Sequence, residues 1–151
     1  MVRAADVTGV LHAVLTCVTA GPGLGFNRAA IFLADAGGTC LRAARAVGAG
    51  SAEEAFETWA RLQSEPQSLD ELTRSPAQTA ADRDGFNALL QGLRLSLERE
   101  VGGNPIVDAF WDRQVVRVRA AEDLDRLPPE LRRVFAGTEV VCVPLVARDR
   151  G

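Results

Sequence analysis

The feature that most constrains the fold is an apolar hairpin pattern in residues 27–47, which read NRAAIFLADAGGTCLRAARAV. Residues 29–34 are apolar at consecutive positions, which is typical of a strand buried on both faces. Residues 35–38 then form a tight turn, because glycine adopts positive φ angles without steric cost. Residues 40–47 run back, with apolar positions interrupted by two arginines. We therefore expect a β-hairpin with one inner and one outer strand.

Helical patterns flank this hairpin on both sides. Six aliphatic residues before it recur at helical spacing and form one stripe: Val7, Val10, Leu11, Val14, Leu15 and Val18. After the hairpin, Ser51 and Glu54 form a capping box for a helix over residues 52–62. Another helix, capped by Asp84, is predicted to continue through Leu97 with one apolar face.

The rest of the chain alternates short helices with short strands. Residues 64–84 read as an irregular connection, and Asn104 begins a short helix. Strands are predicted at residues 114–119 and 139–147, separated by helical turns that two prolines interrupt. The order predicts an α+β fold, in which helices flank an antiparallel sheet within a single domain of residues 1–151.

Composition limits the classes of function. A hydrophobic fraction of 47% and a charged fraction of 25% are ordinary for a soluble globular protein. The net charge of −3 does not favour binding to nucleic acid or to an anionic membrane. No apolar run approaches the roughly 20 residues that a membrane-spanning helix needs. The three cysteines are unevenly spaced, which favours buried reduced thiols in a cytoplasmic protein.

Three segments resemble GAF domains of bacterial signalling proteins, especially those attached to histidine kinases. They are residues 23–35, residues 41–59 and residues 140–151, which read GLGFNRAAIFLAD, LRAARAVGAGSAEEAFETW and VVCVPLVARDRG. The resemblance implies a sheet of five or six antiparallel strands, with helices on one face and a small-molecule pocket on the other. It also implies a sensory module that is joined to an output domain.

The resemblance further implies a homodimer formed through the first helix. Such a contact needs apolar residues that do not face the sheet, and Leu11 and Val7 are the candidates.

The chain departs from the members of this family that have known ligands or activities. It has no lysine, and therefore lacks the Asn-Lys element of the cyclic-nucleotide-binding signature. Its one histidine, His12, falls in the first helix and has no cysteine beside it, unlike the chromophore site of bilin-binding members. We therefore expect no catalytic residue, no metal and no cofactor. Two alternatives stay open: a thiol enzyme of the methionine-sulfoxide-reductase type, and a ligand-free dimerisation module.

Two aromatic residues and three charged ones cluster in residues 108–113, just before a predicted strand. Aromatic walls with a few polar groups suit a small-molecule site, so Phe110, Trp111 and Arg113 are the candidate ligand-binding residues. In the alternative interpretation, the two rings seal the core while the charges point to water. Trp59 is a fourth candidate, which either faces the same cavity or packs on the sheet.

The last expectation concerns strand order. In the family, one further strand lies between the first strand and the one at residues 139–147, and it follows the turn at residues 148–151. No such strand is present in these 151 residues. Because both flanking strands are apolar, we do not expect their edges to stay exposed. The two strands could pair directly, or a strand from another chain could lie between them. We favour a third interpretation, in which the sequence is a fragment of a longer protein.

Overall fold

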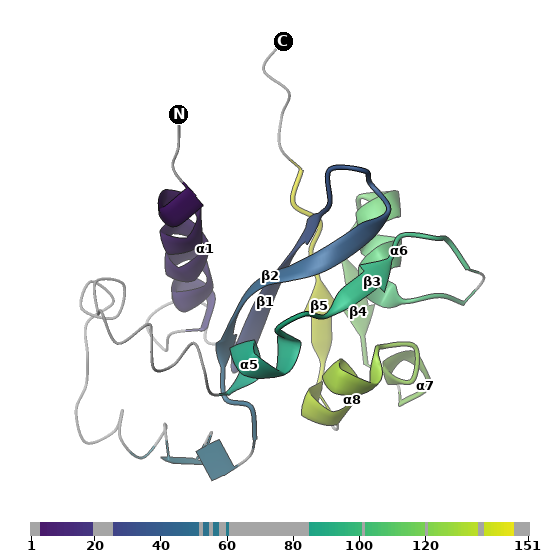
Figure 1. Ribbon diagram of the computed structural model, residues 1–151. Helices are drawn as coiled ribbons and strands as arrows, with labels where there is room; N and C mark the ends of the chain where they lie inside the picture. The colour runs from purple at the N-terminus through teal and green to yellow at the C-terminus, as the bar shows by residue number, and fades with distance from the viewer. Residues whose placement is uncertain are drawn as a thin grey trace. The chain divides into compact units, whose positions relative to one another are not determined.

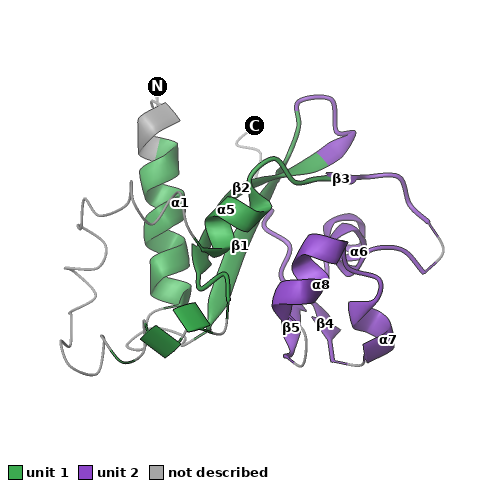
Figure 2. Ribbon diagram, turned by 60° about the horizontal axis from the view of Figure 1, so that its bottom comes forward, with its two compact units in different colours: residues 1–35, 41–94 green, residues 36–40, 95–151 purple. Residues whose placement is uncertain are grey.

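The computed structural model describes residues 4–19, 26–51, 53–54, 56–57, 60, 85–100, 102–119, 121–135 and 138–146. The elements follow in the order α1, β1, β2, α5, β3, α6, β4, α7, α8 and β5 (Figure 1). The chain divides into two compact units (Figure 2), and the predicted α+β class is confirmed. The hairpin unit comprises residues 1–35 and 41–94, and the α6 unit comprises residues 36–40 and 95–151.

The predicted hairpin is present. Strand β1 (Arg28–Ala34) pairs antiparallel with β2 (Cys40–Gly48), and the sheet order is β1-β2-β3. The register shifts where Ile31 pairs with Arg45 while the next residue, Phe32, pairs with Ala43. This shift leaves one extra residue in β2, as in a β-bulge.

Strand β1 is less buried than its sequence predicts. Of its seven residues Ile31 alone is buried, and Leu33 is 43% exposed. Among the described strands, β1 is the terminal member of its sheet and has one hydrogen-bonded neighbour, β2. The expectation of burial on both faces is therefore wrong for the described residues.

Helix α1 (Ala4–Thr19) forms as predicted and packs against β1. Only part of its apolar stripe is buried. Leu15 is buried, whereas Val7, Val10 and Val14 are 42%, 59% and 48% exposed. The most buried part of the helix also includes a polar residue, Thr16, at 7% exposure.

The helix predicted to continue through Leu97 is wrong beyond residue 90. Helix α5 spans Phe86–Leu90 and its N-cap is Gly85, whereas the predicted cap, Asp84, lies outside the described residues. Strand β3 (Arg94–Ser96) follows.

A glycine and a change of periodicity explain this difference. The chain leaves the helix at Gln91, and Gly92, with a φ angle of 84° that L-residues rarely adopt, completes the turn. From that point the burial alternates with period two, since Leu95 and Leu97 are buried and Ser96 between them is exposed. Two of the leucines that match helical spacing, Leu93 and Leu97, thus flank β3 instead of continuing the helix.

The capping box after the hairpin is formed in a modified version. Ser51 Oγ accepts a hydrogen bond from the Glu54 N–H at 3.1 Å, as predicted. The Glu54 carboxylate accepts from the Gly50 N–H at 2.7 Å, one residue earlier than the standard pattern. Trp59, in the helix predicted at residues 52–62, lies outside the described residues.

The α6 unit is built on a two-stranded sheet. Its elements are α6 (Pro105–Asp112), β4 (Val116–Val118), α7 (Ala121–Leu124), α8 (Pro129–Phe135) and β5 (Val140–Cys142). Strands β4 and β5 pair antiparallel, with Val116 opposite Cys142, and α6 packs against both. Val118 and Leu131, at 1% and 2% exposure, belong to the core of this unit.

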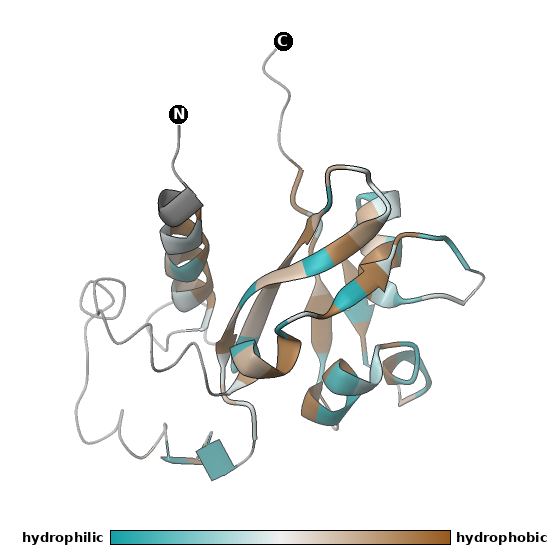
Figure 3. Ribbon diagram, in the orientation of Figure 1, coloured by the Kyte–Doolittle hydropathy of each residue, from teal (hydrophilic) through white to brown (hydrophobic). Residues whose placement is uncertain are grey.

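Strand β5 is shorter than predicted, because pairing stops at Cys142 instead of continuing to residue 147. Pro144 has no N–H to donate, so it cannot extend a ladder. The apolar residues around it remain exposed, Val143 at 59% and Leu145 at 73%. Figure 3 shows the hydrophobic character of β5 and of the segment that follows it. Among the described residues, no helix combines the length and the apolar character needed to cross a membrane.

Candidate functional site

The candidate site lies at the C-terminal end of α6. The helix begins where Asn104 Oδ1 accepts a hydrogen bond from the Ile106 N–H at 2.9 Å, and Pro105 occupies the first turn. Its first two turns bury Pro105, Val107 and Ala109. From residue 110 to residue 115 every residue is exposed. The aromatic end of the helix therefore projects from the core instead of sealing it.

Phe110 and Trp111 form an aromatic pair on this end. Their ring centroids are 5.3 Å apart, with an angle of 80° between the ring planes, which is an edge-to-face arrangement. They are 36% and 47% exposed. The indole Nε1 of Trp111 donates a hydrogen bond to the Leu97 carbonyl at 2.9 Å. Because its polar group is occupied, Trp111 offers a ligand the surface of its ring.

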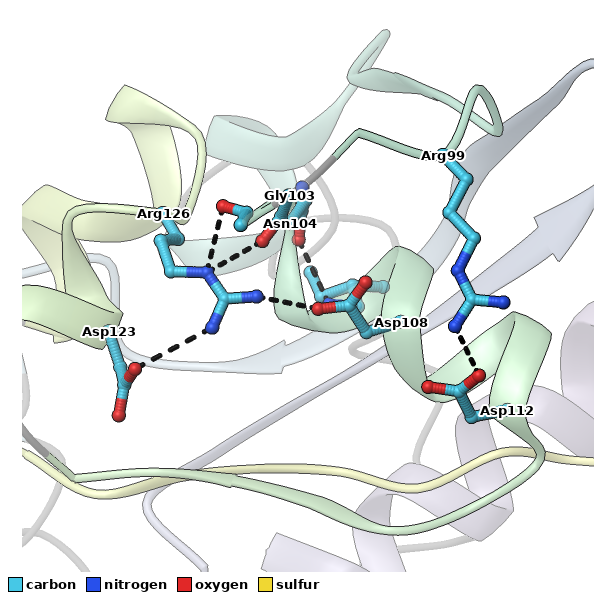
Figure 4. Close-up of polar contacts among 9 residues, drawn as sticks. Arg99, Gly103, Asn104, Asp108, Asp112, Asp123 and Arg126 are labelled. Atoms are coloured by element: carbon cyan, nitrogen blue, oxygen red, sulfur yellow. Dashed lines mark hydrogen bonds and ion pairs between the residues drawn. The ribbon is translucent and has the colours of Figure 1, made fainter.

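Both acidic residues of α6 are paired with arginines. Asp112 accepts a hydrogen bond from Arg99, and Asp108 Oδ2 accepts from Arg126 Nη2 at 2.6 Å (Figure 4). Neither carboxylate is left as an unpaired negative charge beside the aromatic pair.

Arg126 ties three segments of the α6 unit together. Its Nε donates to the carbonyls of Gly102 and Gly103, at 3.0 and 2.7 Å (Figure 4). Its Nη1 lies 3.6 Å from Asp123 Oδ1 of α7, while Nη2 holds Asp108 of α6. Arg126 thus fixes the start of α6 and leaves the far end of the helix accessible.

Arg113 follows the aromatic pair in an unusual backbone conformation. It is the C-cap of α6 with φ 53° and ψ 35°, and it is the one described residue other than glycine with a positive φ. The residue is exposed and forms no ion pair among the described residues. The end of α6 therefore presents two ring surfaces. It also presents the positive charge of Arg113, which has no ion-pair partner among the described residues.

The structure brings three of the four predicted site residues to one helix end, while Trp59 lies outside the described residues. Two contributors were not predicted, Leu97 and Arg99, which hold Trp111 and Asp112. The sequence pattern predicts that residue 97 is helical, so it gives no indication that the carbonyl of this residue accepts a hydrogen bond from Trp111. For Arg99, the only available signal was an arginine in an acidic loop that precedes an acidic helix.

The thiols were predicted to be buried, and this is confirmed for Cys40 and Cys142, whereas Cys17 is half-buried. Burial raises the pKa of the Cys142 thiol to about 11. No group of three or more potential metal ligands occurs within the described residues.

Comparisons of the chain with models of protein families, with curated proteins and with solved structures found no match.

Proposed function

We propose that the chain is a GAF-like cytoplasmic sensory module, which passes a ligand or partner signal to an attached output domain such as a bacterial histidine kinase. The proposal rests first on the resemblance of residues 23–35 and 41–59 to that family. Two local features within these segments support it, the β1-β2 hairpin and the hydrogen bond between Ser51 and Glu54.

The observation that carries a binding role is the exposed pair of Phe110 and Trp111. Large aromatic side chains are usually buried, and an exposed edge-to-face pair provides a surface on which a planar ligand can stack. The unpaired charge of Arg113 favours a ligand that carries negative charge. We therefore assign the ligand to the class of small planar anions.

The binding role is tested with 1-naphthoate as the planar anion and 1-naphthamide as its uncharged counterpart. We expect naphthoate to bind more tightly than the amide, and Trp111→Ala to weaken naphthoate binding roughly tenfold, because stacking is lost. Leu89→Ala is the matched control, since Leu89 is an equally exposed apolar residue of the hairpin unit, at 48%. Calorimetric titration of the folded variants measures both effects.

Equal binding by the wild type, Trp111→Ala and Leu89→Ala would contradict a site at the end of α6. A Trp111→Ala variant that is unfolded by circular dichroism would instead assign Trp111 to the core. In that case Arg113→Gln, at an exposed position, tests the same site through the preference for naphthoate over naphthamide.

A second part of the proposal is a homodimer formed through α1. Val7, Val10 and Val14 recur at spacings of three and four residues and are all exposed, which is the pattern of a helix–helix seam. Leu11, one of the two candidates from the sequence, is half-buried, so Val10 and Val14 take its place beside Val7. The same face suits the alternative of a ligand-free dimerisation module.

The thiol-enzyme alternative receives no support from Cys142. A catalytic cysteine acts as a thiolate, which requires exposure and a lowered pKa. Cys142 is 8% exposed, and burial shifts the pKa of its thiol in the opposite direction.

The proposal includes the additional strand that the resemblance implies. Its support is that β1 and β5 each have one hydrogen-bonded neighbour among the described strands. Without a second neighbour, amides along the outer edge of β5 should exchange with solvent in seconds to minutes, and a peptide that supplies the strand should protect them. Protection of both β5 edges in the 151-residue chain alone would contradict this strand order.

A further inference from the structure

A polar cluster joins α1 to the hairpin within the hairpin unit. Arg45 Nη2 of β2 lies 3.2 Å from His12 Nδ1 of α1, and Thr16 Oγ1 lies 3.3 Å from His12 Nε2. Arg45 and Thr16 are 8% and 7% exposed. The contact between Arg45 and His12 connects side chains that are 33 residues apart in the sequence, and both contacts are partly buried.

The hydrogen-bond chemistry of this cluster determines the protonation state of His12. A guanidinium group donates hydrogen bonds and cannot accept them, so His12 Nδ1 must offer its lone pair to Arg45. The proton of the neutral imidazole is then on Nε2, from which it is donated to Thr16 Oγ1. A second proton, on Nδ1, would remove the acceptor and place an imidazolium against a buried guanidinium.

Two other described elements place uncharged residues beside Arg45 and the residue that follows it. Strand β1 places Ile31 opposite Arg45, and α5 contributes the uncharged Asn87, whose Oδ1 accepts from the Ala46 N–H at 2.8 Å. Thr16 is the neighbour on α1 itself. His12 and Arg45 also take part in further interactions, so the contact between them is one part of a larger network.

We propose that His12 is a pH-sensitive latch between α1 and the hairpin. When the imidazole is neutral it accepts the Arg45 hydrogen bond and holds the helix on the sheet. Histidine side chains change charge between about pH 5 and 8, and protonation at the acidic end of this range breaks this bond and loosens α1. Because His12 is the one histidine of the chain, a transition in this range can be assigned to it.

Hydrogen exchange of the α1 amides, corrected for intrinsic rates, tests the latch at about pH 7.5 and pH 5.5. We expect their protection to fall roughly tenfold or more at the lower pH, since a hydrogen bond to a charged group is lost. The amides of the β4-β5 ladder serve as the internal reference and should keep their protection. His12→Asn supplies an oxygen that accepts from Arg45 and does not titrate, so its α1 should be insensitive to pH.

A pair of arginine variants provides the matched control. Arg45→Met should abolish the pH dependence, whereas Arg42→Met, at an exposed position of the same strand, should retain it. Constant α1 protection in the wild type would overturn the latch, as would an equal loss of protection in His12→Asn. If the variants do not fold, the nitrogen chemical shifts of His12 in the unaltered protein test the latch, because they show which ring nitrogen carries the proton. A proton on Nδ1 at neutral pH contradicts the proposal.

Discussion

At the scale of single residues, the aromatic pair owes its accessibility to one hydrogen bond. The indole N–H of Trp111 is bound to the Leu97 carbonyl, so the ring can stay at the surface with its polar group satisfied. This removes the usual reason for a tryptophan to seek a buried polar partner. Arg113 then follows in the left-handed conformation, which directs the chain out of α6 and toward β4.

Arg113→Gly is expected to raise stability while it lowers the affinity for planar anions. A residue with a side chain in the left-handed region is strained by about 1 kcal/mol, and glycine removes that strain. Gln114→Gly is the control, because residue 114 has no positive φ and glycine there costs roughly 0.5–1 kcal/mol. Urea denaturation of both variants measures the difference. A destabilised Arg113→Gly would show that the arginine side chain itself holds the fold.

The Cys142 thiol predicts a loss of stability at alkaline pH. Its pKa is raised from 9.0 to about 11 by burial, so the unfolded chain releases this proton first. The contribution of this thiol to the free energy of unfolding is therefore complete below about pH 9. It is lost as the pH rises to about 11, which lowers the free energy of unfolding by roughly 2–3 kcal/mol. The chain has no tyrosine and its basic residues are all arginines, so few other groups titrate in this window.

Cys142→Ala should abolish that decline, and Cys17→Ala should preserve it, because Cys17 is half-buried in α1. Thermal unfolding at stepped pH values measures the effect. Identical pH profiles for the wild type and Cys142→Ala would mean that another group controls alkaline stability.

At the scale of elements, the sequence correctly predicted the features that depend on residues close together in the chain. The turn glycines and the apolar segments on either side of them identified the hairpin, and Asn104 with Pro105 identified the start of α6. The helix through residue 97 failed because leucines at 89, 90, 93 and 97 satisfy helical spacing, while those at 93, 95 and 97 satisfy a strand. Gly92 selects the second pattern, and this choice depends on the sheet partner β2.

The contacts that define both proposed sites join residues distant in the sequence. Trp111 binds the carbonyl of residue 97, and His12 meets Arg45 across 33 positions. In the sequence, Arg45 interrupts an apolar strand, and His12 falls in the first helix with no cysteine beside it. Periodicity reports which residues share a face, but it does not report which faces meet.

Arg126→Met should destabilise the α6 unit by roughly 2 kcal/mol, because Asp108 loses its partner and two backbone carbonyls lose their donor. The expected loss of stability is moderate because the arginine side chain is 32% exposed, and solvent weakens its ion pairs. Arg133→Met is the control, since Arg133 is exposed on α8 and forms no ion pair among the described residues. If the two variants have equal unfolding midpoints in urea, the network in Figure 4 contributes no net stability.

Val10→Asp should convert the proposed α1 dimer to monomers. A charge at a helix–helix seam opposes association, while Val10, at 59% exposure, contributes little to the fold of the single chain. Sedimentation equilibrium measures the change. Val143→Asp, at an equally exposed valine of the α6 unit, should leave association intact. A wild type that is monomeric at high concentration would remove the dimer.

At the scale of the whole molecule, the features of the proposed sensory role are divided between the two units. The hairpin unit holds the exposed face of α1 and the His12–Arg45 contact, and the α6 unit holds the aromatic pair. In this proposal, ligand binding is a property of the α6 unit alone and can be measured without reference to the output domain.

The most direct test of that claim is a map of amide chemical shifts while planar anions, beginning with 1-naphthoate, are titrated into the isotope-labelled protein. We predict that the largest changes occur at residues 97–99 and 108–115, together with the indole N–H of Trp111. The same titration with 1-naphthamide should produce smaller changes at these positions. Changes that are absent at high probe concentration, or that are concentrated in the hairpin unit, would contradict a ligand site at the end of α6.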